Sequence, residues 1–263
     1  MQTRPREGQY DVRIGASQYS PIISVFGSLA VPAVIVVLQD KAFVSHLPYE
    51  ELALALLIIG ILGSLGSGFG FAAIAAERDP TANLIPAVMY LAVPASVGLG
   101  SVLAAFGVVA DLHLPDVSLL FSVLLTLLGL FGVFFTASAV MDAGGVGPRN
   151  QTDETVNSEW LKLQWISDRD KAPRKAIPLI LIASGAIAAG FIVRVTTHWF
   201  IEPNYVGTVV TVSILGALSL LAIGLTSYRT VHRAAQVGLR RREAYAATLA
   251  IALFIVFLLF VVP

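Results

Sequence analysis

The stretch LALALLIIGILGSLGSGFGFAAIAAERDP (residues 52–80) contains an uncharged run of 25 residues that ends abruptly in the sequence ERDP. As an α-helix this run would extend about 37 Å, enough to cross the ~30 Å hydrocarbon core of a bilayer. Its glycines lie inside the predicted helix, where backbone N–H groups are already hydrogen-bonded, so they cannot form a phosphate-binding loop. The stretch therefore predicts a membrane-spanning helix.

Six further apolar runs have similar length, and together they account for the high hydrophobic content of 56%. None shows the alternation of polar and apolar residues that a barrel strand requires. The sequence therefore predicts an all-α integral membrane protein with seven transmembrane helices. The predicted spans are 21–39, 52–76, 84–110, 117–141, 177–200, 206–228 and 244–262.

Basic residues are distributed very unevenly between the two sides of this arrangement. If the chain starts in the cytoplasm, the inner segments carry fifteen Lys and Arg residues and the outer loops carry only Lys41. This bias predicts a cytoplasmic N-terminus and an outward-facing C-terminus, in the cell membrane. The expected organisation is a cytoplasmic segment (1–20), four spans (21–141), a cytoplasmic loop (142–176) and three spans (177–263) with a basic loop at 229–243.

Short sequence repeats suggest that the spans form three outward–inward hairpins followed by a final helix. LAVPA occurs at 29–33 and again at 91–95, and ILGSLG (61–66) is echoed by LLGLFG (127–132) and ILGALS (214–219). Duplicated hairpins would give parallel repeats of the kind found in some transporters. Chance matches within the small alphabet of membrane helices are the alternative.

Glycines at helical spacing within the spans predict close contact between helices. Small residues let backbones approach where lipid provides no hydrophobic driving force between helices. This interpretation is favoured over an ion path. The predicted packing residues are Gly63, Gly66, Gly70, Gly129, Gly132 and Gly216.

Arg194 is the one formal charge well inside a predicted span. It lies in the outer third of span 177–200, one turn before His198. Two interpretations stay open: an anchor whose side chain reaches the outer headgroups, or part of an outward-facing pocket or ion pair. Glu202 is a candidate partner if the chain turns back near Pro203.

Two cytoplasmic segments are candidate contact surfaces. Trp160 and Trp165 lie among basic residues in loop 142–176, which predicts a short segment at the headgroup level or, alternatively, a docking site for a partner. Arg229, Arg233 and Arg240 share one helical stripe in segment 228–245, predicted to continue the sixth helix and to bind anionic lipid or an acidic partner.

No catalytic motif is present, and no metal or cofactor is expected. Histidines and acids on the predicted outer side come from different loops without metal-ligand spacing. The zero net charge argues against nucleic acid as a partner.

The sequence therefore favours a non-enzymatic membrane subunit, or a partner-binding component of a larger complex, that associates with other membrane subunits or with itself. The alternative is a transporter or channel for a small solute or ion. Proton coupling usually needs a membrane-buried carboxylate, and no predicted span offers one at mid-membrane, so Na⁺ is the expected ion.

Overall fold

The computed structural model describes residues 12–39, 47–77, 84–145, 158–201, 204–231 and 241–262. This part of the chain is helical, which confirms the predicted fold class. The elements are α1 (Val12–Gln39), α2 (Leu47–Ala75), α3 (Leu84–His113), α4 (Pro115–Gly145), α5 (Ser158–Thr197), α6 (Tyr205–Val231) and α7 (Arg241–Val261).

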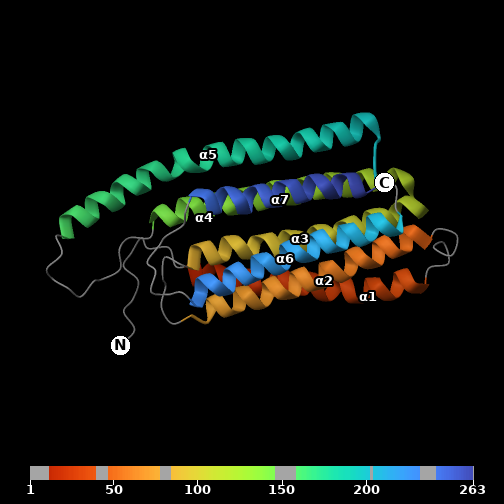
Figure 1. Cartoon of the computed structure of the whole chain (residues 1–263), viewed down its shortest axis with the longest axis horizontal. Helices are drawn as coiled ribbons and strands as arrows, with labels where there is room; N and C mark the ends of the chain where they lie inside the picture. The colour runs from red at the N-terminus through yellow and green to blue at the C-terminus, as the bar shows by residue number, and fades with distance from the viewer. Residues whose placement is uncertain are drawn as a thin grey trace.

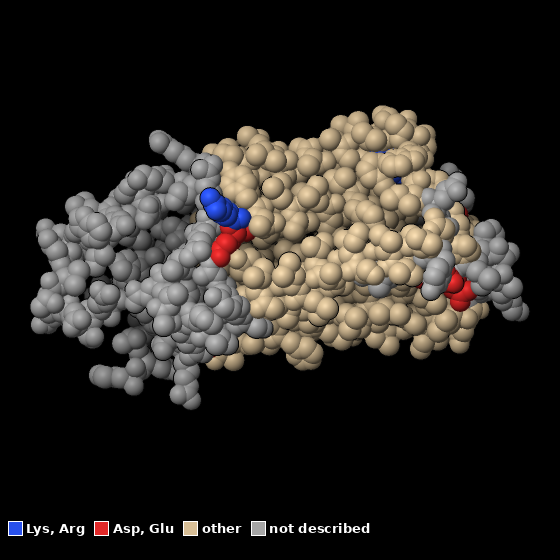
Figure 2. All heavy atoms as spheres, viewed as in Figure 1, with Lys and Arg blue, Asp and Glu red and all other residues tan. Residues whose placement is uncertain are grey.

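All seven described helices contain a segment long and apolar enough to cross a membrane. In Figure 2, the charged atoms lie towards the two ends of the molecule, and a broad uncharged belt separates them. The helices run roughly parallel to one long axis (Figure 1). We call the end where α1 begins the N-terminal end of the bundle, and the end where α7 stops the C-terminal end.

Helix α3 fills the centre of the bundle. It packs against α1, α2, α4, α6 and α7, and its buried residues run without a break from Leu84 to Gly98. A helix surrounded in this way has no face left for lipid over much of its length. Side chains and backbone of α3 therefore occupy the bundle axis.

The first two predicted hairpins pack as pairs, because α1 lies against α2 and α3 lies against α4. The third does not: α5 packs on α4 and α7, whereas α6 packs on α2 and α3. Figure 1 shows α5 at one edge of the bundle, beside α7 and α4, with α6 alongside α3 and α2. Helices α5 and α6 therefore do not pack closely against each other as the hairpin pattern predicted, because α3 and α7 provide the surfaces that these two helices cover.

Helices α2 and α3 meet at backbone contact. A Cβ atom added to Gly63 would lie 2.7 Å from the carbonyl oxygen of Pro94 and 3.0 Å from the Cα atom of Gly98. In the reverse direction, a Cβ on Gly98 would lie 2.5 Å from the Ser64 nitrogen. No flexible side chain stands between the two helices here, so only glycine fits at both positions.

The other predicted packing glycines face side chains. A Cβ on Gly66 would lie 3.0 Å from Ile223 of α6, and one on Gly70 would lie 2.5 Å from Leu91 of α3. On α4, Gly129 faces Ile255 at 2.7 Å, and Gly132 faces Ile251 at 3.0 Å. These contacts join α2 to α3 and α6, and α4 to α7.

Gly216 lies outside any such contact. A Cβ atom placed there meets nothing within 4 Å, so no contact within the described part of the chain supports its assignment to helix packing. The reason is the position of α6 at the edge of the bundle: this side of the helix has no neighbour in the described part of the chain.

Hydroxyl groups also join the helices. Thr248 of α7 donates a hydrogen bond to Thr136 of α4 over 2.9 Å, and both side chains are fully buried. Ser20 of α1 donates to the Gly68 carbonyl oxygen over 2.9 Å. Thr136 and Thr248 also lie within hydrogen-bond distance of carbonyl oxygens in their own helices, Val133 at 2.9 Å and Ala244 at 2.8 Å, so the bond between them adds a link between helices to hydroxyls that already have a partner.

Helix α5 is longer than the sequence predicted. Residues 158–176 were assigned to a cytoplasmic loop with a short interfacial segment, but the backbone is helical without interruption from Ser158 to Thr197, 40 residues. Because charged residues are frequent before Ala176, the hydropathy pattern did not predict a helix there. Only Ala176–Thr197 qualifies as a span, and in Figure 1 the other end of α5 projects beyond the bundle.

Candidate functional site

A polar cluster around Arg194 lies at the C-terminal end of the bundle. The Arg194 side chain is buried, with 9% of its surface exposed. Its Nε atom donates a hydrogen bond to the Val262 carbonyl oxygen over 3.3 Å, and its guanidinium carbon lies 5.9 Å from the centre of the Phe200 ring. The guanidinium is thus held by protein groups on two sides.

The acidic member of the cluster is Asp111, in the last turn of α3. Its carboxylate attracts the Arg194 guanidinium and is hydrogen-bonded to the side chain of Ser118 on α4. Residues from α3, α4 and α5 and the backbone at the end of α7 therefore contribute to one site. We call Asp111, Ser118, Arg194, Phe200 and the Val262 carbonyl the Arg194 cluster.

Helix α5 ends within one turn of Arg194. His198 directly follows α5 and has a left-handed conformation (φ 51°), and its backbone nitrogen donates to the Arg194 carbonyl oxygen over 3.1 Å. Beyond this turn, Ile201 donates to the Phe260 carbonyl oxygen over 2.7 Å, and the Trp199 and Phe260 rings lie 5.2 Å apart. These contacts fasten the end of α5 to the end of α7.

The Arg194 cluster brings together groups from α3, α4, α5 and the end of α7. The last carbonyl groups of a helix lack intrahelical partners and carry partial negative charge, so a cation placed there is stabilising. Arg194 supplies this cation to α7 and balances the Asp111 carboxylate at the end of α3. The five N–H groups of a guanidinium allow it to serve both at once.

A second arginine has the same relation to a helix end at the opposite side of the bundle. Arg13 of α1 donates from Nη1 to the Glu77 carbonyl oxygen, just after α2, over 2.9 Å. Sequence reasoning used Arg13 only as a marker of topology. The sequence signal that could have predicted this contact is a basic residue, Arg13, shortly before one predicted span, at the same side of the membrane as the end of the next span.

Several predicted site residues lie outside what the structure describes. Glu202, the expected partner of Arg194, is among them, as are Arg233 and Arg240. For Trp160, Trp165 and Arg229 the backbone is helical, but the side chains are not described. The partner that the structure does give to Arg194 is Asp111, which the sequence analysis did not single out.

A metal centre has no support in the described part of the chain. His113 ends α3 and His198 follows α5, while His46 lies outside the described residues. Among the residues that the structure describes, no three His, Cys, Asp or Glu side chains lie close enough together to hold a metal ion.

Comparison with protein-family models, with curated protein sequences and with solved structures found no match to this chain. Its class therefore rests on its own helices. Their length, apolar composition and charge-free belt make it a polytopic helical membrane protein.

Proposed function

We propose that the protein is a non-enzymatic membrane component that docks a partner polypeptide through the projecting half of α5. The observation that carries this proposal is the length of that helix. At 1.5 Å per residue, its 40 residues extend about 60 Å, whereas a bilayer core needs only ~30 Å. The 18 residues before Ala176 form what we call the α5 arm (158–175).

The direction of the α5 arm favours binding to a partner polypeptide and not to the membrane surface. A helix that binds headgroups lies in the plane of the interface. The arm instead continues a spanning helix without a break and leads beyond the ends of the other helices (Figure 1). It carries two tryptophans, Trp160 and Trp165, among residues of both charges. Tryptophan is enriched among the side chains that dominate protein–protein binding energy.

The positive-inside bias places the N-terminal end of the bundle, and with it the α5 arm, in the cytoplasm of a cell whose plasma membrane holds the protein. The basic residues of that end, including Arg229, Arg233 and Arg240, would also favour anionic lipids. Fusions of a reporter after residue 145 and after residue 262 test this orientation. The first is expected to be active only inside the cell and the second only outside.

Transport is the alternative function, and the position of α3 argues against it. A path along the bundle axis would require α3 to leave its place among five other helices. Helices α2 and α3 would also have to separate, since their backbones touch at Gly63 and Gly98.

The test is purification in mild detergent with a paired substitution of the α5 arm. Trp160→Ala together with Trp165→Ala should abolish stoichiometric copurification of the partner while expression and thermal stability stay normal. Trp199→Ala is the control at the other end of the bundle: it loses the ring contact with Phe260 and can lower thermal stability, but it should retain the partner. Retention of the partner by the double variant would overturn docking through the arm, and solute or ion flux from the protein alone in liposomes would favour transport.

A further inference from the structure

The Arg194 guanidinium has more hydrogen-bond donors than the described part of the chain uses. Of its five N–H groups, the one on Nε donates to the Val262 carbonyl oxygen. The terminal nitrogens, Nη1 and Nη2, form no hydrogen bond with any residue that the structure describes. A buried cation with unbonded N–H groups is unfavourable. A group that offers acceptors at this point would therefore be selected.

The terminal nitrogens of Arg194 can be reached from outside the protein. In the described part of the chain, the side-chain polar atoms that are fully enclosed without a hydrogen-bond partner all belong to serine and threonine residues. Nη1 and Nη2 are not among them, so the 9% of the Arg194 surface that remains exposed includes these two nitrogens. A ligand atom can approach them there.

Asp111 gives the site a second charge, of opposite sign. Its carboxylate is hydrogen-bonded to Ser118 and not to Arg194, although the two charges attract each other. The Asp111 side chain is half-buried, so it too is accessible from outside. The site therefore presents a cation and an anion that lie near each other without direct pairing.

These two charges favour one class of ligand. A guanidinium binds phosphate or carboxylate oxygens through paired N–H groups, so an oxyanion would satisfy Nη1 and Nη2. A ligand with a net negative charge would also be repelled by the Asp111 carboxylate. A zwitterion, with an ammonium group close to its oxyanion, would be attracted by both residues.

The surface beside the Arg194 cluster is apolar and belongs to a helix that can span a membrane. Ile192 and Val193, directly before Arg194, expose 58% and 43% of their surfaces, and Trp199 exposes 60%. A soluble zwitterion would leave these side chains uncovered. A lipid places a zwitterionic headgroup and apolar chains on one molecule, which matches a charged site with an apolar surround.

We propose that the Arg194 cluster binds a lipid headgroup that carries a phosphate and a primary ammonium, as in phosphatidylethanolamine. The phosphate accepts hydrogen bonds from Nη1 and Nη2 of Arg194, and the ammonium donates to the Asp111 carboxylate. The site lies at the opposite end of the bundle from the α5 arm. Failure of this proposal would therefore leave partner docking untouched, and the reverse also holds.

The experiment measures, by native mass spectrometry, which lipid the delipidated protein retains from an equimolar mixture. Dioleoyl phosphatidylethanolamine and dioleoyl phosphatidylglycerol share their acyl chains and phosphate, but only the first has an ammonium group. The wild-type chain should retain one phosphatidylethanolamine in preference to phosphatidylglycerol by about 2- to 5-fold, the ratio that one partly exposed ion pair provides.

Three variants test the roles of the two charges. Asp111→Asn removes the carboxylate charge with little change in shape, so it should abolish the preference for phosphatidylethanolamine. Arg194→Gln should lower the retention of both lipids roughly 10-fold or more. Arg13→Gln is the matched control, because it also removes a guanidinium bonded to a carbonyl at a helix end, and it should leave retention and preference normal.

The preference is a ratio measured within one folded sample, so a loss of stability in a variant does not imitate its loss. Equal retention of the two lipids by the wild-type chain, or an unchanged preference in Asp111→Asn, would overturn the proposal. Glycerophosphoethanolamine, which has the same headgroup without acyl chains, tests the source of the ligand. It should not displace the lipid at equal concentration, and displacement would show that the site serves a soluble zwitterion instead.

Discussion

Gly63 and Gly216 occupy the same place in two nearly identical sequences, ILGSLG and ILGALS, yet their surroundings differ completely. Gly63 touches the backbone of α3 at Pro94 and Gly98, whereas a side chain at Gly216 would meet open space. Both helices are apolar and of similar length. The motif makes close contact possible, and the presence of a neighbouring helix decides whether it occurs.

The two LAVPA sequences show the same difference. Pro94 lies in the buried centre of α3, while Pro32 of α1 is exposed. One copy faces other helices on every side, and the other faces outward. If the hairpins arose by duplication, their copies no longer share an environment.

The largest effect is expected for Gly63→Leu. A leucine cannot fit where a Cβ alone would lie 2.7 Å from a backbone oxygen, so α2 and α3 must separate. We expect a loss of about 3 kcal/mol or more in the free energy of unfolding, measured by denaturation in detergent. Gly63→Ala should also destabilise the bundle, and an unchanged midpoint for both variants would contradict the backbone contact.

Helices α5 and α7 are held together by a charged side chain, whereas α2 and α3 are held by glycine contact. Arg194→Gln, which removes that charge, should give the next largest effect. The variant removes the charge that balances Asp111 and weakens the hydrogen bond to Val262. A loss of about 2 kcal/mol in the free energy of unfolding is expected. Arg194→Lys keeps the charge and should cost less, so an equal loss for both variants would show that charge is not what matters.

Thr248→Val tests the hydroxyl bridge between α4 and α7 with little change in shape. It removes the 2.9 Å hydrogen bond to Thr136. Hydrogen bonds between membrane helices average about 0.6 kcal/mol, so a loss of roughly this size is expected in the same unfolding measurement. A loss above about 2 kcal/mol would mean that the bridge rivals the Arg194 cluster.

The smallest effect is expected for Gly216→Leu, which completes the comparison with Gly63→Leu. Since nothing lies within 4 Å of the added Cβ, the free energy of unfolding should change by less than about 0.5 kcal/mol. Destabilisation comparable to that of Gly63→Leu would show that α6 has a neighbour in the membrane, such as another copy or a partner subunit.

The spanning helices could be predicted because their signal is local. An apolar run of about 20 residues has few alternatives to a membrane helix, and the seven predicted spans match α1 to α7 to within a few residues at most ends. The exceptions are α1, which starts at Val12, and α5, which starts at Ser158. At α5, the charged residues before Ala176 extend the helix beyond the apolar run, whereas the added stretch of α1, VRIGASQYS, is polar with one charge, Arg13.

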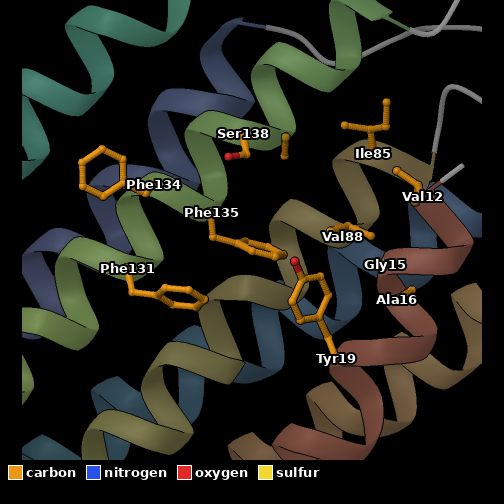
Figure 3. A pocket seen from close by; sticks show the side chains of 11 residues that line it. Val12, Gly15, Ala16, Tyr19, Ile85, Val88, Phe131, Phe134, Phe135 and Ser138 are labelled. Atoms are coloured by element: carbon orange, nitrogen blue, oxygen red, sulfur yellow. The ribbon is translucent and has the colours of Figure 1, made fainter. Parts of the chain in front are cut away.

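The candidate site could be predicted only in part, because its members are distant in sequence. Arg194 was identified by its charge alone. Its relation to Asp111 and to the Val262 carbonyl depends on α5 packing beside α7, and the predicted hairpin order placed α5 beside α6 instead. The groove between α1, α3 and α4 (Figure 3) depends in the same way on α1 and α4 both flanking α3.

The central position of α3 has a consequence for the order in which the protein is assembled. Three of the helices that surround it, α4, α6 and α7, follow it in the chain, and more than a hundred residues separate His113 from Arg241, where α7 begins. While the ribosome is adding those residues, the sides of α3 that α6 and α7 will cover remain open to lipid or to the insertion machinery. The bundle therefore closes late in synthesis, and a chain stalled before α7 would present an unfinished surface to membrane quality control.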